Sequence, residues 1–356
     1  MRIGIPREIK TLEGRVALIP DACADLVKAG HEVLLERDAG LRAGYPDDQY
    51  RQAGVKVVDD AEALYGQAQL LLKVKEPVEG DLALLREDHT LFCYLHLAAS
   101  PALARQLQEI GLTAVGFETV EESDGRLPLL APMSDIAGRL SVQVGTHLLH
   151  QPEGGRGILL GGMPAAERGH VVIIGAGEAG GNAAAVAAAL GARVTVFDRK
   201  REKLAAMQAL GPNVTALYPY AHAIDKAVRA ADMVIGAVLV VGQRAPHVVS
   251  ADLVRAMAAG SVVVDISVDQ GGCIETTRPT TYDAPTYVWE DVVHFTVTNM
   301  PGAVPRTAVQ ALSAALLPYV MQMAEGENWS RHQPLQRGLN VQDGRIVHPG
   351  VAASLQ

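Results

Sequence analysis

The segment Gly175-Ala176-Gly177-Glu178-Ala179-Gly180 has the residue types and the spacing of a turn that binds the pyrophosphate of a dinucleotide. The apolar run that begins at residue 170 predicts a strand before this turn, and the small residues of 178–192 predict a helix after it. Asp198 ends the next apolar run, near the spacing of about 20 residues that the motif requires. A glycine motif alone is weak, but this context favours a binding turn over packing alone.

Each residue of this turn has a separate physical task. Gly175 permits the tight turn, Gly177 lets the backbone approach a pyrophosphate, and Gly180 lets the helix pack close to the strand. The helix N-terminus offers unpaired N–H groups and a positive partial charge to the phosphates. Asp198 would accept hydrogen bonds from the adenosine ribose, and its charge favours NAD over NADP. The basic residues 199–201 could tolerate a 2′-phosphate, although solvated surface charge is the simpler interpretation.

Four more polar side chains stand near the ends of apolar runs, where open α/β sheets bind their ligands. Arg15 follows the first run, and Lys75 and His96 each end a later one. Asp269 lies just past a run of β-branched residues. Taken singly, such residues are commonly surface charges, core histidines or turn caps.

The elements that must position these residues alternate between strand and helix, which predicts parallel sheets with helices on their faces. Strands are expected at 2–6, 31–36, 55–59, 70–75, 90–96, 113–118, 170–177, 193–198, 232–240 and 261–267. Helices are expected at 21–30, 100–111, 133–151, 178–192 and 305–326. Ser100 is a candidate N-cap for the second of these helices. The Gly- and Pro-rich stretch 152–169 is expected to be a loop.

The order of these elements predicts two Rossmann-like domains of the doubly wound α/β class. A dinucleotide-binding domain, residues 134–304, would be inserted into a discontinuous substrate domain made of residues 1–133 and 305–356. The helix expected at 305–326 would return the chain to the first domain. Two domains also agree with the chain length of 356 residues.

Composition limits the possible partners of the chain. Its net charge of −9 argues against nucleic acid, which needs a basic face. We expect neither a secretory signal nor a membrane-spanning helix, because no apolar run has the required length. Three widely separated cysteines predict neither a disulfide framework nor a zinc site. His147 and His150 could share a helix face, but no third ligand is evident, so we expect no metal.

Five separated motifs, in this order along nearly the whole chain, resemble the alanine dehydrogenase family. They read RIGIPREIKTLEGRVALIP, LLKVKEP, YLHLAAS, VDISVDQGGCIETTRPTT and TNMPGAVPRT. The NAD-binding part of proton-translocating transhydrogenase is a related family that shares some of this pattern. The chain departs from the family pattern in two loops, around 39–50 and 217–225. The first departure concerns loop shape rather than the expected reaction, and the second concerns a nucleotide contact in its loop.

The resemblance implies a role for each of the four polar residues. Arg15 would hold the substrate carboxylate, since a planar guanidinium suits bidentate binding. Lys75 would hydrogen-bond the substrate and polarise its 2-oxo oxygen. His96 would be the general acid and base, because the pKa of an imidazole lies near neutrality. Asp269 would balance positive charge on the imine and ammonium states.

The resemblance also implies NAD as the cofactor, and L-alanine, pyruvate and ammonia as the substrates. It implies a homohexamer. The cysteine usage and the apolar run lengths favour a reduced, cytoplasmic enzyme without a membrane partner. The cofactor contacts implied by the turn and by the family motifs are Ser134, Gly175, Gly177, Glu178, Ala179, Gly180, Asp198, Lys203, Leu239, Val240, Ile266, Ser267, Val268, Arg278, Asn299 and Met300.

Three other functions are compatible with parts of this pattern. A dehydrogenase of another small 2-amino acid would need only a resized side-chain pocket. The soluble NAD-binding subunit of a transhydrogenase would pass its electrons to a membrane partner. A non-catalytic NAD-binding protein would not need Arg15, Lys75, His96 and Asp269 together, and their presence favours the dehydrogenase.

Overall fold

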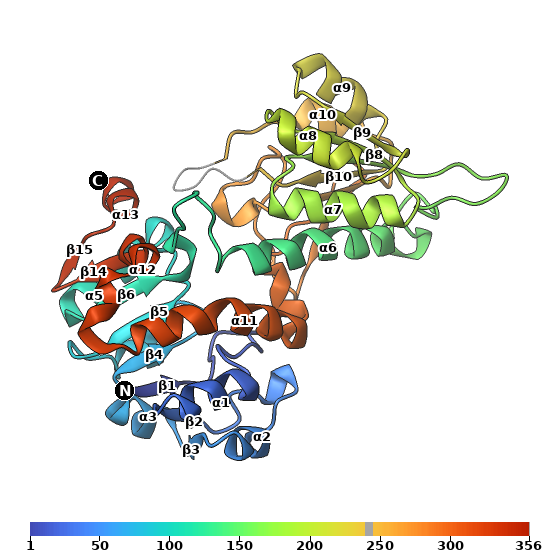
Figure 1. Ribbon diagram of the computed structural model, residues 1–356. Coiled ribbons are helices and arrows are strands. Elements are labelled where there is room, and N and C mark those ends of the chain that lie inside the picture. The colour runs from blue at the N-terminus through green and yellow to red at the C-terminus, as the bar shows by residue number, and fades with distance from the viewer. Residues whose placement is uncertain (239–244, 356) are drawn as a thin grey trace. The chain divides into compact units, whose positions relative to one another are not determined.

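The computed structural model describes residues 1–238 and 245–355, and it contains two units, each built on its own sheet (Figure 1). Unit 1 is Met1–Met133 with Gly302–Gln356, and unit 2 is Ser134–Pro301. The chain leaves unit 1 within helix α6, Ala131–Leu148, and helix α11, Pro305–Met323, belongs to unit 1 again. Unit 2 is therefore an insertion in a discontinuous unit 1.

The sheet of unit 2 has the strand order β12-β13-β11-β10-β7-β8-β9. All neighbouring strands pair in parallel except the edge strand β12, which is antiparallel to β13. The strands are β7 His170–Ile174, β8 Arg193–Phe197, β9 Val214–Leu217, β10 Met233–Gly236, β11 Val262–Asp265, β12 Thr286–Trp289 and β13 Val292–Phe295. The order reverses beside β7, which is where doubly wound sheets bind their ligands.

Both faces of this sheet are buried, and alternate residues of each strand serve opposite faces. Val171 and Ile173 of β7 join a core cluster with α6 and with α7, Glu178–Ala189. Val172 and Ile174 join a second cluster with α9, Ala221–Arg229, and α10, Ala251–Arg255. Helix α8, Arg201–Gln208, contacts β9 at the sheet edge. Continuous apolar strands are what a sheet covered on both faces requires.

The sheet of unit 1 has the strand order β15-β14-β6-β5-β4-β1-β2-β3. The six strands from β6 to β3 pair in parallel, and β14 and β15 add an antiparallel edge. The strands are β1 Arg2–Ile5, β2 Glu32–Glu36, β3 Lys56–Val58, β4 Leu70–Leu72, β5 Thr90–Cys93, β6 Thr113–Gly116, β14 Leu339–Gln342 and β15 Arg345–Ile346. Strands β1, β4, β5 and β6 are the part of this sheet that positions the candidate site.

The helices of unit 1 also cover its sheet. The core cluster that contains Leu71 and Leu91 also contains residues of helices α3 and α5, whereas α1 packs against α11. The helices are α1 Pro20–Lys28, α2 Asp47–Gln52, α3 Ala61–Gln67, α4 Glu79–Leu82, α5 Pro101–Ile110, α12 Gln333–Gly338 and α13 Pro349–Ser354, together with α11.

These elements confirm the predicted fold class. Each strand and helix expected from the sequence overlaps an observed element of the same type, and the observed element usually ends a few residues earlier. The stretch 152–169 contains a short 3-10 turn and one isolated β-bridge but no described helix or strand of the α/β core, as a loop should. Ser100 does stand at the N-cap of α5, but its side chain makes no capping hydrogen bond. Strands β9 and β12–β15 were not predicted.

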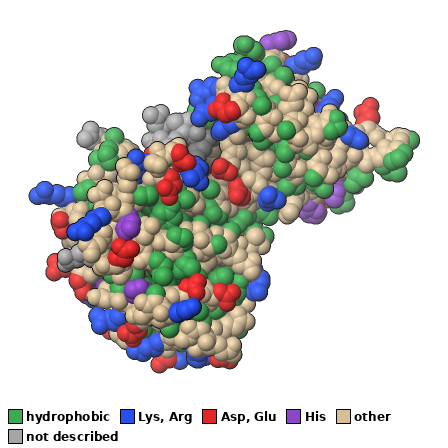
Figure 2. All heavy atoms as spheres, in the orientation of Figure 1, with side chains coloured by type: hydrophobic (Ala, Val, Ile, Leu, Met, Phe, Trp, Pro, Cys, Tyr) green, Lys and Arg blue, Asp and Glu red, His purple; other side chains and the backbone are tan. Residues whose placement is uncertain are grey.

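The described residues show how the charged side chains and the cysteines of this chain are distributed. On the face drawn in Figure 2, Lys and Arg side chains lie among Asp and Glu side chains, so no broad basic area is visible there. Cys23, Cys93 and Cys273 are buried free thiols. Within the described residues, no helix combines the length and the apolar composition that crossing a bilayer demands.

Candidate active site

The glycine turn of unit 2 joins β7 to α7. Gly175 has φ 101°, and a Cβ there would lie 2.5 Å from the Ala237 carbonyl oxygen. A Cβ on Gly180 would lie 1.8 Å from the Gly175 carbonyl oxygen, so only glycine lets the helix pack this closely. At Gly177, the N-cap of α7, the nearest atom to such a Cβ is Lys203 Nζ at 4.0 Å. The backbone is therefore open at the helix N-terminus, where a phosphate would be held.

Asp198 lies at the end of β8 and is tied to the glycine turn. One carboxylate oxygen accepts a hydrogen bond from the Ala176 backbone N–H at 2.9 Å, and the other accepts one from the Lys200 N–H at 2.8 Å. Each oxygen has a second lone pair, so the carboxylate can still accept from a ribose hydroxyl. The turn and the acidic residue thus form one local structure, which fits a dinucleotide.

The remaining predicted cofactor residues also belong to unit 2, as far as it is described. Ser134 is on α6, Ile266 follows β11, and the exposed Arg278 has its guanidinium 4.3 Å from the ring centroid of Tyr287. Glu178, Ala179 and Lys203 lie on α7 and α8, Ser267 and Val268 follow Ile266, and Asn299 and Met300 follow β13. Leu239 and Val240 lie outside the described residues.

A buried carboxylate that the sequence reasoning missed organises the loop after β11. Asp265 is fully buried and accepts hydrogen bonds from the backbone N–H groups of Ser267 at 3.0 Å and Cys273 at 3.0 Å. It also accepts from the Thr277 hydroxyl at 2.9 Å. The exposed Asp269 lies inside the loop that these bonds close, in the 3-10 turn Val268–Gln270. An Asp at the end of a run of valines was the sequence feature that could have revealed it.

In unit 1, neighbouring parallel strands bring candidate residues to one edge of the sheet. Strand β4 pairs with β1 on one side and with β5 on the other. Lys75 lies three residues past the last residue of β4, Leu72, and His96 lies three residues past the last residue of β5, Cys93. The carboxyl ends of parallel strands lie at the same edge, so the two side chains share it.

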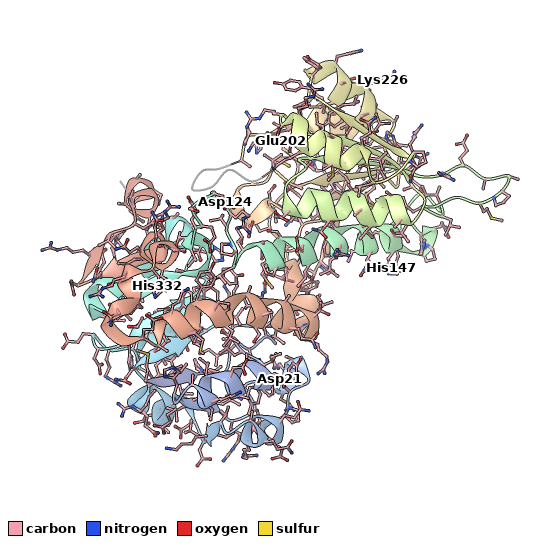
Figure 3. All side chains as sticks on the ribbon, in the orientation of Figure 1. Asp21, Asp124, His147, Glu202, Lys226 and His332 are labelled. Carbon is pink, nitrogen blue, oxygen red and sulfur yellow. The ribbon has the colours of Figure 1, made fainter. Side chains whose placement is uncertain are left out.

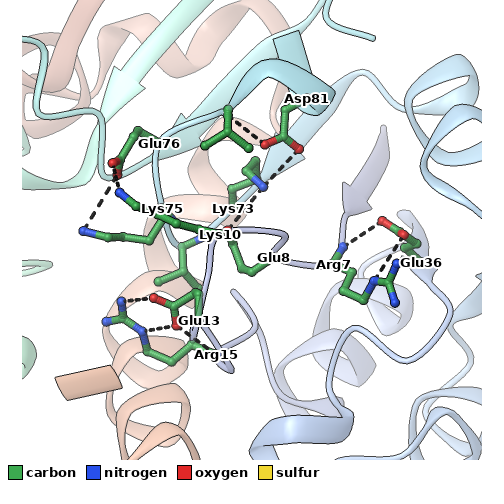
Figure 4. Close-up of polar contacts among 12 residues, drawn as sticks. Arg7, Glu8, Lys10, Glu13, Arg15, Glu36, Lys73, Lys75, Glu76 and Asp81 are labelled. Carbon is green, nitrogen blue, oxygen red and sulfur yellow. Dashed lines mark hydrogen bonds and ion pairs between the residues drawn. The ribbon is translucent and has the colours of Figure 1, made fainter. Parts of the chain in front are cut away.

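Arg15 is buried and bound by a carboxylate that was not predicted (Figure 4). Its Nε donates to Glu13 Oε1 at 2.7 Å, and its Nη2 donates to Glu13 Oε2 at 2.6 Å. Burial alone would lower the pKa of Arg15, but the hydrogen bonds and charge of Glu13 outweigh it and raise that pKa. Since a guanidinium has five N–H donors, it can bind Glu13 and a second carboxylate together.

Lys75 is held through its backbone by another carboxylate missed in the sequence. Glu8 accepts hydrogen bonds from the N–H groups of Val74 at 2.6 Å and Lys75 at 3.3 Å. The buried Lys73 neutralises Glu8, with its Nζ 3.3 Å from Glu8 Oε2 (Figure 4). Burial lowers the pKa of Lys75, the charge of Glu76 opposes this, and the charge of Arg15 lowers it further.

His96 begins a sharp turn and stacks on an aromatic ring. Its φ of 49° and ψ of 35° are left-handed, which is uncommon outside glycine and often marks a functional site. Its ring is nearly parallel to that of the buried Tyr94, with centroids 5.9 Å apart. Burial raises the pKa of Tyr94, and the charge of Arg15 opposes that rise. Arg15 is therefore near enough to act electrostatically on both Tyr94 and Lys75.

Lys75 and His96 therefore share one edge of the unit 1 sheet, and Arg15 acts electrostatically on Lys75 and on Tyr94, the ring on which His96 stacks. A guanidinium binds carboxylates, an ammonium polarises a carbonyl oxygen, and an imidazole transfers protons. Unit 2 holds the dinucleotide turn and Asp269. The three groups of unit 1 can bind a small carboxylic acid and exchange protons with it.

The other histidines singled out in the sequence belong to unit 2. His147 is exposed near the end of α6 in unit 2, with its side chain directed away from the sheet (Figure 3). Its ring meets His150 edge-on at 5.9 Å, and its Nε2 lies 3.5 Å from Glu153. This is a surface contact on the opposite side of α6 from the core residues.

The whole chain is similar to known alanine dehydrogenases, and it shares its fold with a transhydrogenase. Residues 4–137 match the family described as "Alanine dehydrogenase/PNT, N-terminal domain", and residues 141–349 match the corresponding C-terminal domain. The alanine dehydrogenase of Mycolicibacterium smegmatis is 45% identical, over 100% of this chain and 97% of that protein. A solved L-alanine dehydrogenase structure has a TM-score of 0.96 and 49% identity, covering 99% of each chain. A transhydrogenase structure from Sinorhizobium meliloti has a TM-score of 0.85, covers 98% of this chain and 99% of that one, and shares the fold at 23% identity.

Proposed function

Because the chain belongs to the alanine dehydrogenase/PNT family, we propose that it catalyses the NAD-dependent, reversible oxidative deamination of L-alanine to pyruvate and ammonia. In balanced form, L-alanine, NAD⁺ and water give pyruvate, ammonium, NADH and a proton. The observation that carries this proposal is that Lys75 and His96 share one edge of the unit 1 sheet, where Arg15 acts electrostatically on Lys75. Unit 1, residues 1–133 and 305–356, is the proposed substrate domain.

NAD, when bound, supplies the acceptor for the hydrogen and electron pair that leave the substrate α-carbon. Residues 134–304 are the proposed NAD domain. The open N-terminus of α7 would hold the pyrophosphate, and Asp198 would hold the ribose. The negative charge of Asp198 would repel the extra phosphate of NADP. Lys203, Ser267, Arg278 and the other predicted contacts would complete this site.

The residues of the chain then bind the substrate and move its protons. Arg15 would bind the substrate carboxylate, and Lys75 would donate a hydrogen bond to the 2-oxo oxygen. His96 would take the proton from the water that adds to the iminium and return one as ammonia leaves. Asp269 would balance the positive charge of the iminium. Buried positions strengthen these electrostatic effects, and Arg15 is only 2% exposed.

The direct test is NADH oxidation by the purified protein with pyruvate and ammonium. We expect turnover with NADH, much slower turnover with NADPH, and a loss of at least about a hundredfold in kcat for His96→Ala and Asp269→Ala. Parallel assays with glyoxylate and 2-oxobutyrate define the side-chain specificity. NADH binding without turnover of any 2-oxo acid would contradict the proposal and favour a transhydrogenase-like subunit.

Assembly and location follow from the same family resemblance. We propose a homohexamer that works in the cytoplasm without a membrane partner. Light scattering on the eluted protein tests the assembly, since one chain has a mass of 37.7 kDa. A mass near that of one chain would contradict the hexamer.

A further inference from the structure

His96 has a backbone conformation that its own side chain does not favour. A residue with a Cβ is strained in the left-handed region, so neighbouring contacts must hold it there. This turn follows β5, and the His96 ring stacks on that of Tyr94. A proton-transferring imidazole needs such a fixed direction, because small displacements slow catalysis strongly.

The contact that holds this turn comes from Glu118. Its Oε1 accepts a hydrogen bond from the His96 backbone N–H at 2.6 Å. The Leu95 N–H lies 3.1 Å from Oε2 and 3.2 Å from Oε1. Two successive N–H groups therefore point at one carboxylate, and charge-assisted bonds of this kind are stronger than bonds between neutral groups.

The sheet register brings Glu118 to this place. Strands β5 and β6 are parallel, and Cys93 is paired with Gly116. Leu95 and Glu118 each lie two residues beyond that pair, so the two strand ends emerge side by side. Glu118 is the middle residue of the 3-10 turn Phe117–Thr119. Its side chain reaches across to the backbone amides of Leu95 and His96.

Glu118 is not engaged as an ordinary salt bridge. Across residues 1–238 and 245–355, no Lys, Arg or His nitrogen lies within ion-pair distance of its carboxylate. Glu121, three residues later, contrasts with it, since its carboxylate lies 3.3 Å from Arg337 Nη1. A carboxylate that is held by backbone amides instead of a cation acts as a cap for the turn.

We propose that Glu118 is a positioning residue for the reaction: its carboxylate caps the Leu95 and His96 amides and thereby fixes the left-handed turn that aims the His96 imidazole. This role rests on the proposed function, because it matters for catalysis only if His96 transfers protons. Glu118 itself touches neither substrate nor cofactor in this role.

The test compares Glu118→Ala and Glu118→Gln with the matched pair Glu121→Ala and Glu121→Gln. In Glu118→Ala, we expect kcat for reductive amination of pyruvate to fall about 10- to 100-fold. The Kd for NADH should remain that of Glu121→Ala, whereas the melting temperature should fall, because the turn loses its cap. Hydrogen exchange, read by mass spectrometry, should become faster at the Leu95 and His96 amides. A role in stability alone would change the melting temperature and leave kcat per folded molecule unchanged.

Glu118→Gln keeps an acceptor oxygen, so it should rescue much of the effect. We expect its kcat to lie between the wild-type and Glu118→Ala values, about fivefold below wild type, with a smaller rise in exchange. If Glu118→Ala does not fold, Glu118→Gln carries the test alone. Wild-type kcat in Glu118→Gln and Glu118→Ala, or a loss of kcat without faster exchange at Leu95 and His96, would overturn the proposal. An inactive wild-type protein would instead reject the proposed function.

Discussion

Three side chains of the candidate site in unit 1 depend on three carboxylates. Glu13 binds the Arg15 guanidinium, Glu8 accepts from the Lys75 backbone, and Glu118 accepts from the His96 backbone. Each carboxylate holds one part of its neighbour, either the guanidinium or the backbone N–H. This arrangement reduces the conformational freedom that substrate binding would otherwise have to remove, which is the physical meaning of preorganisation.

The lowered pKa of Lys75 leads to a prediction about pH. Lys75 must carry its proton to donate to a 2-oxo oxygen, and burial lowers its pKa below the ordinary 10.5. The proton is therefore lost at a lower pH than from an exposed lysine, and binding of 2-oxo acids should weaken from there upward. The measurement is the inhibition constant of oxamate, competing with pyruvate, as a function of pH.

The variant Lys75→Arg distinguishes deprotonation of Lys75 from deprotonation of any other group in the site. Arginine keeps its charge up to a pKa above about 12, so the alkaline weakening should disappear. Affinity should fall at least about tenfold throughout, because a guanidinium does not replace an ammonium at a fitted site. The same alkaline weakening in Lys75→Arg would show that another group is titrating.

Asp198 carries a prediction about cofactor choice. Asp198→Asn removes the charge that would repel a 2′-phosphate but keeps an acceptor for one of the two backbone N–H groups. We expect the KM for NADPH to fall and the KM for NADH to rise, so the preference changes about tenfold or more. Steady-state kinetics with both cofactors measures it. Glu202→Gln, at an exposed acid of α8, should change neither KM.

At the scale of elements, the packing of α7 on the glycine turn can be tested directly. A Cβ on Gly180 meets the Gly175 carbonyl oxygen, whereas a Cβ on Gly181 meets Met207 Cε at 3.5 Å. Gly180→Ala should therefore displace α7, raise the Kd for NADH about tenfold or more, and cost about 1–3 kcal/mol of stability. Fluorescence titration with NADH and thermal unfolding measure the two effects.

Gly181→Ala is the internal control for that experiment. Its side chain makes an ordinary contact, and alanine is favoured over glycine inside a helix by about 1 kcal/mol. We expect unchanged NADH affinity and equal or higher stability. Equal Kd values in the two variants would mean that close packing at Gly180 does not shape the binding turn.

The strands that sequence reasoning found and missed differ in a physical way. The buried parallel strands are continuous apolar runs, which are easy to recognise. The two unpredicted hairpins turn on two-residue loops with positive φ, at Glu290-Asp291 and at Asp343-Gly344. Asp-Gly is a strong hairpin sequence and could have predicted β14 and β15. Glu-Asp is not, so nothing in the sequence marked the turn between β12 and β13.

The same distinction applies to the candidate site. The glycines, Asp198 and the residues at strand ends could be selected because their positions relative to a strand carry the information. Glu8, Glu13 and Glu118 could not, because their contacts depend on side-chain direction and on which strands are neighbours. Glu118 meets His96 only through the pairing of β5 with β6, which no local pattern specifies.

At the scale of the whole molecule, both units bury neutral histidines. In unit 1, His89 Nε2 lies 3.0 Å from the Tyr65 carbonyl oxygen and must donate, while Nδ1 accepts from the Arg86 N–H at 3.1 Å. In unit 2, His170 and His294 likewise each have one ring nitrogen on a backbone carbonyl and the other on a threonine hydroxyl. Burial lowers the pKa of all three.

These histidines predict that acid destabilises the fold. In the unfolded chain a histidine binds its proton near the ordinary pKa of 6.5, whereas buried His89 binds it only at lower pH. Below pH 6.5 the unfolded state therefore binds more protons than the folded state. The free energy of unfolding keeps its whole histidine contribution above that pH, and below it falls by up to about 1.4 kcal/mol per pH unit for each histidine.

His89→Gln cannot titrate and should therefore lose about 1 kcal/mol less of its free energy of unfolding than wild type between about pH 7.5 and about pH 5.5. Urea unfolding at equal protein concentration measures this, with the exposed His222→Gln as a control that keeps the wild-type slope. If the free energy of unfolding of His89→Gln fell with acid as steeply as that of wild type, other groups would be setting the acid sensitivity. Burial raises the pKa of Glu8, so protonation of Glu8 at low pH favours the folded state and opposes the effect of the histidines.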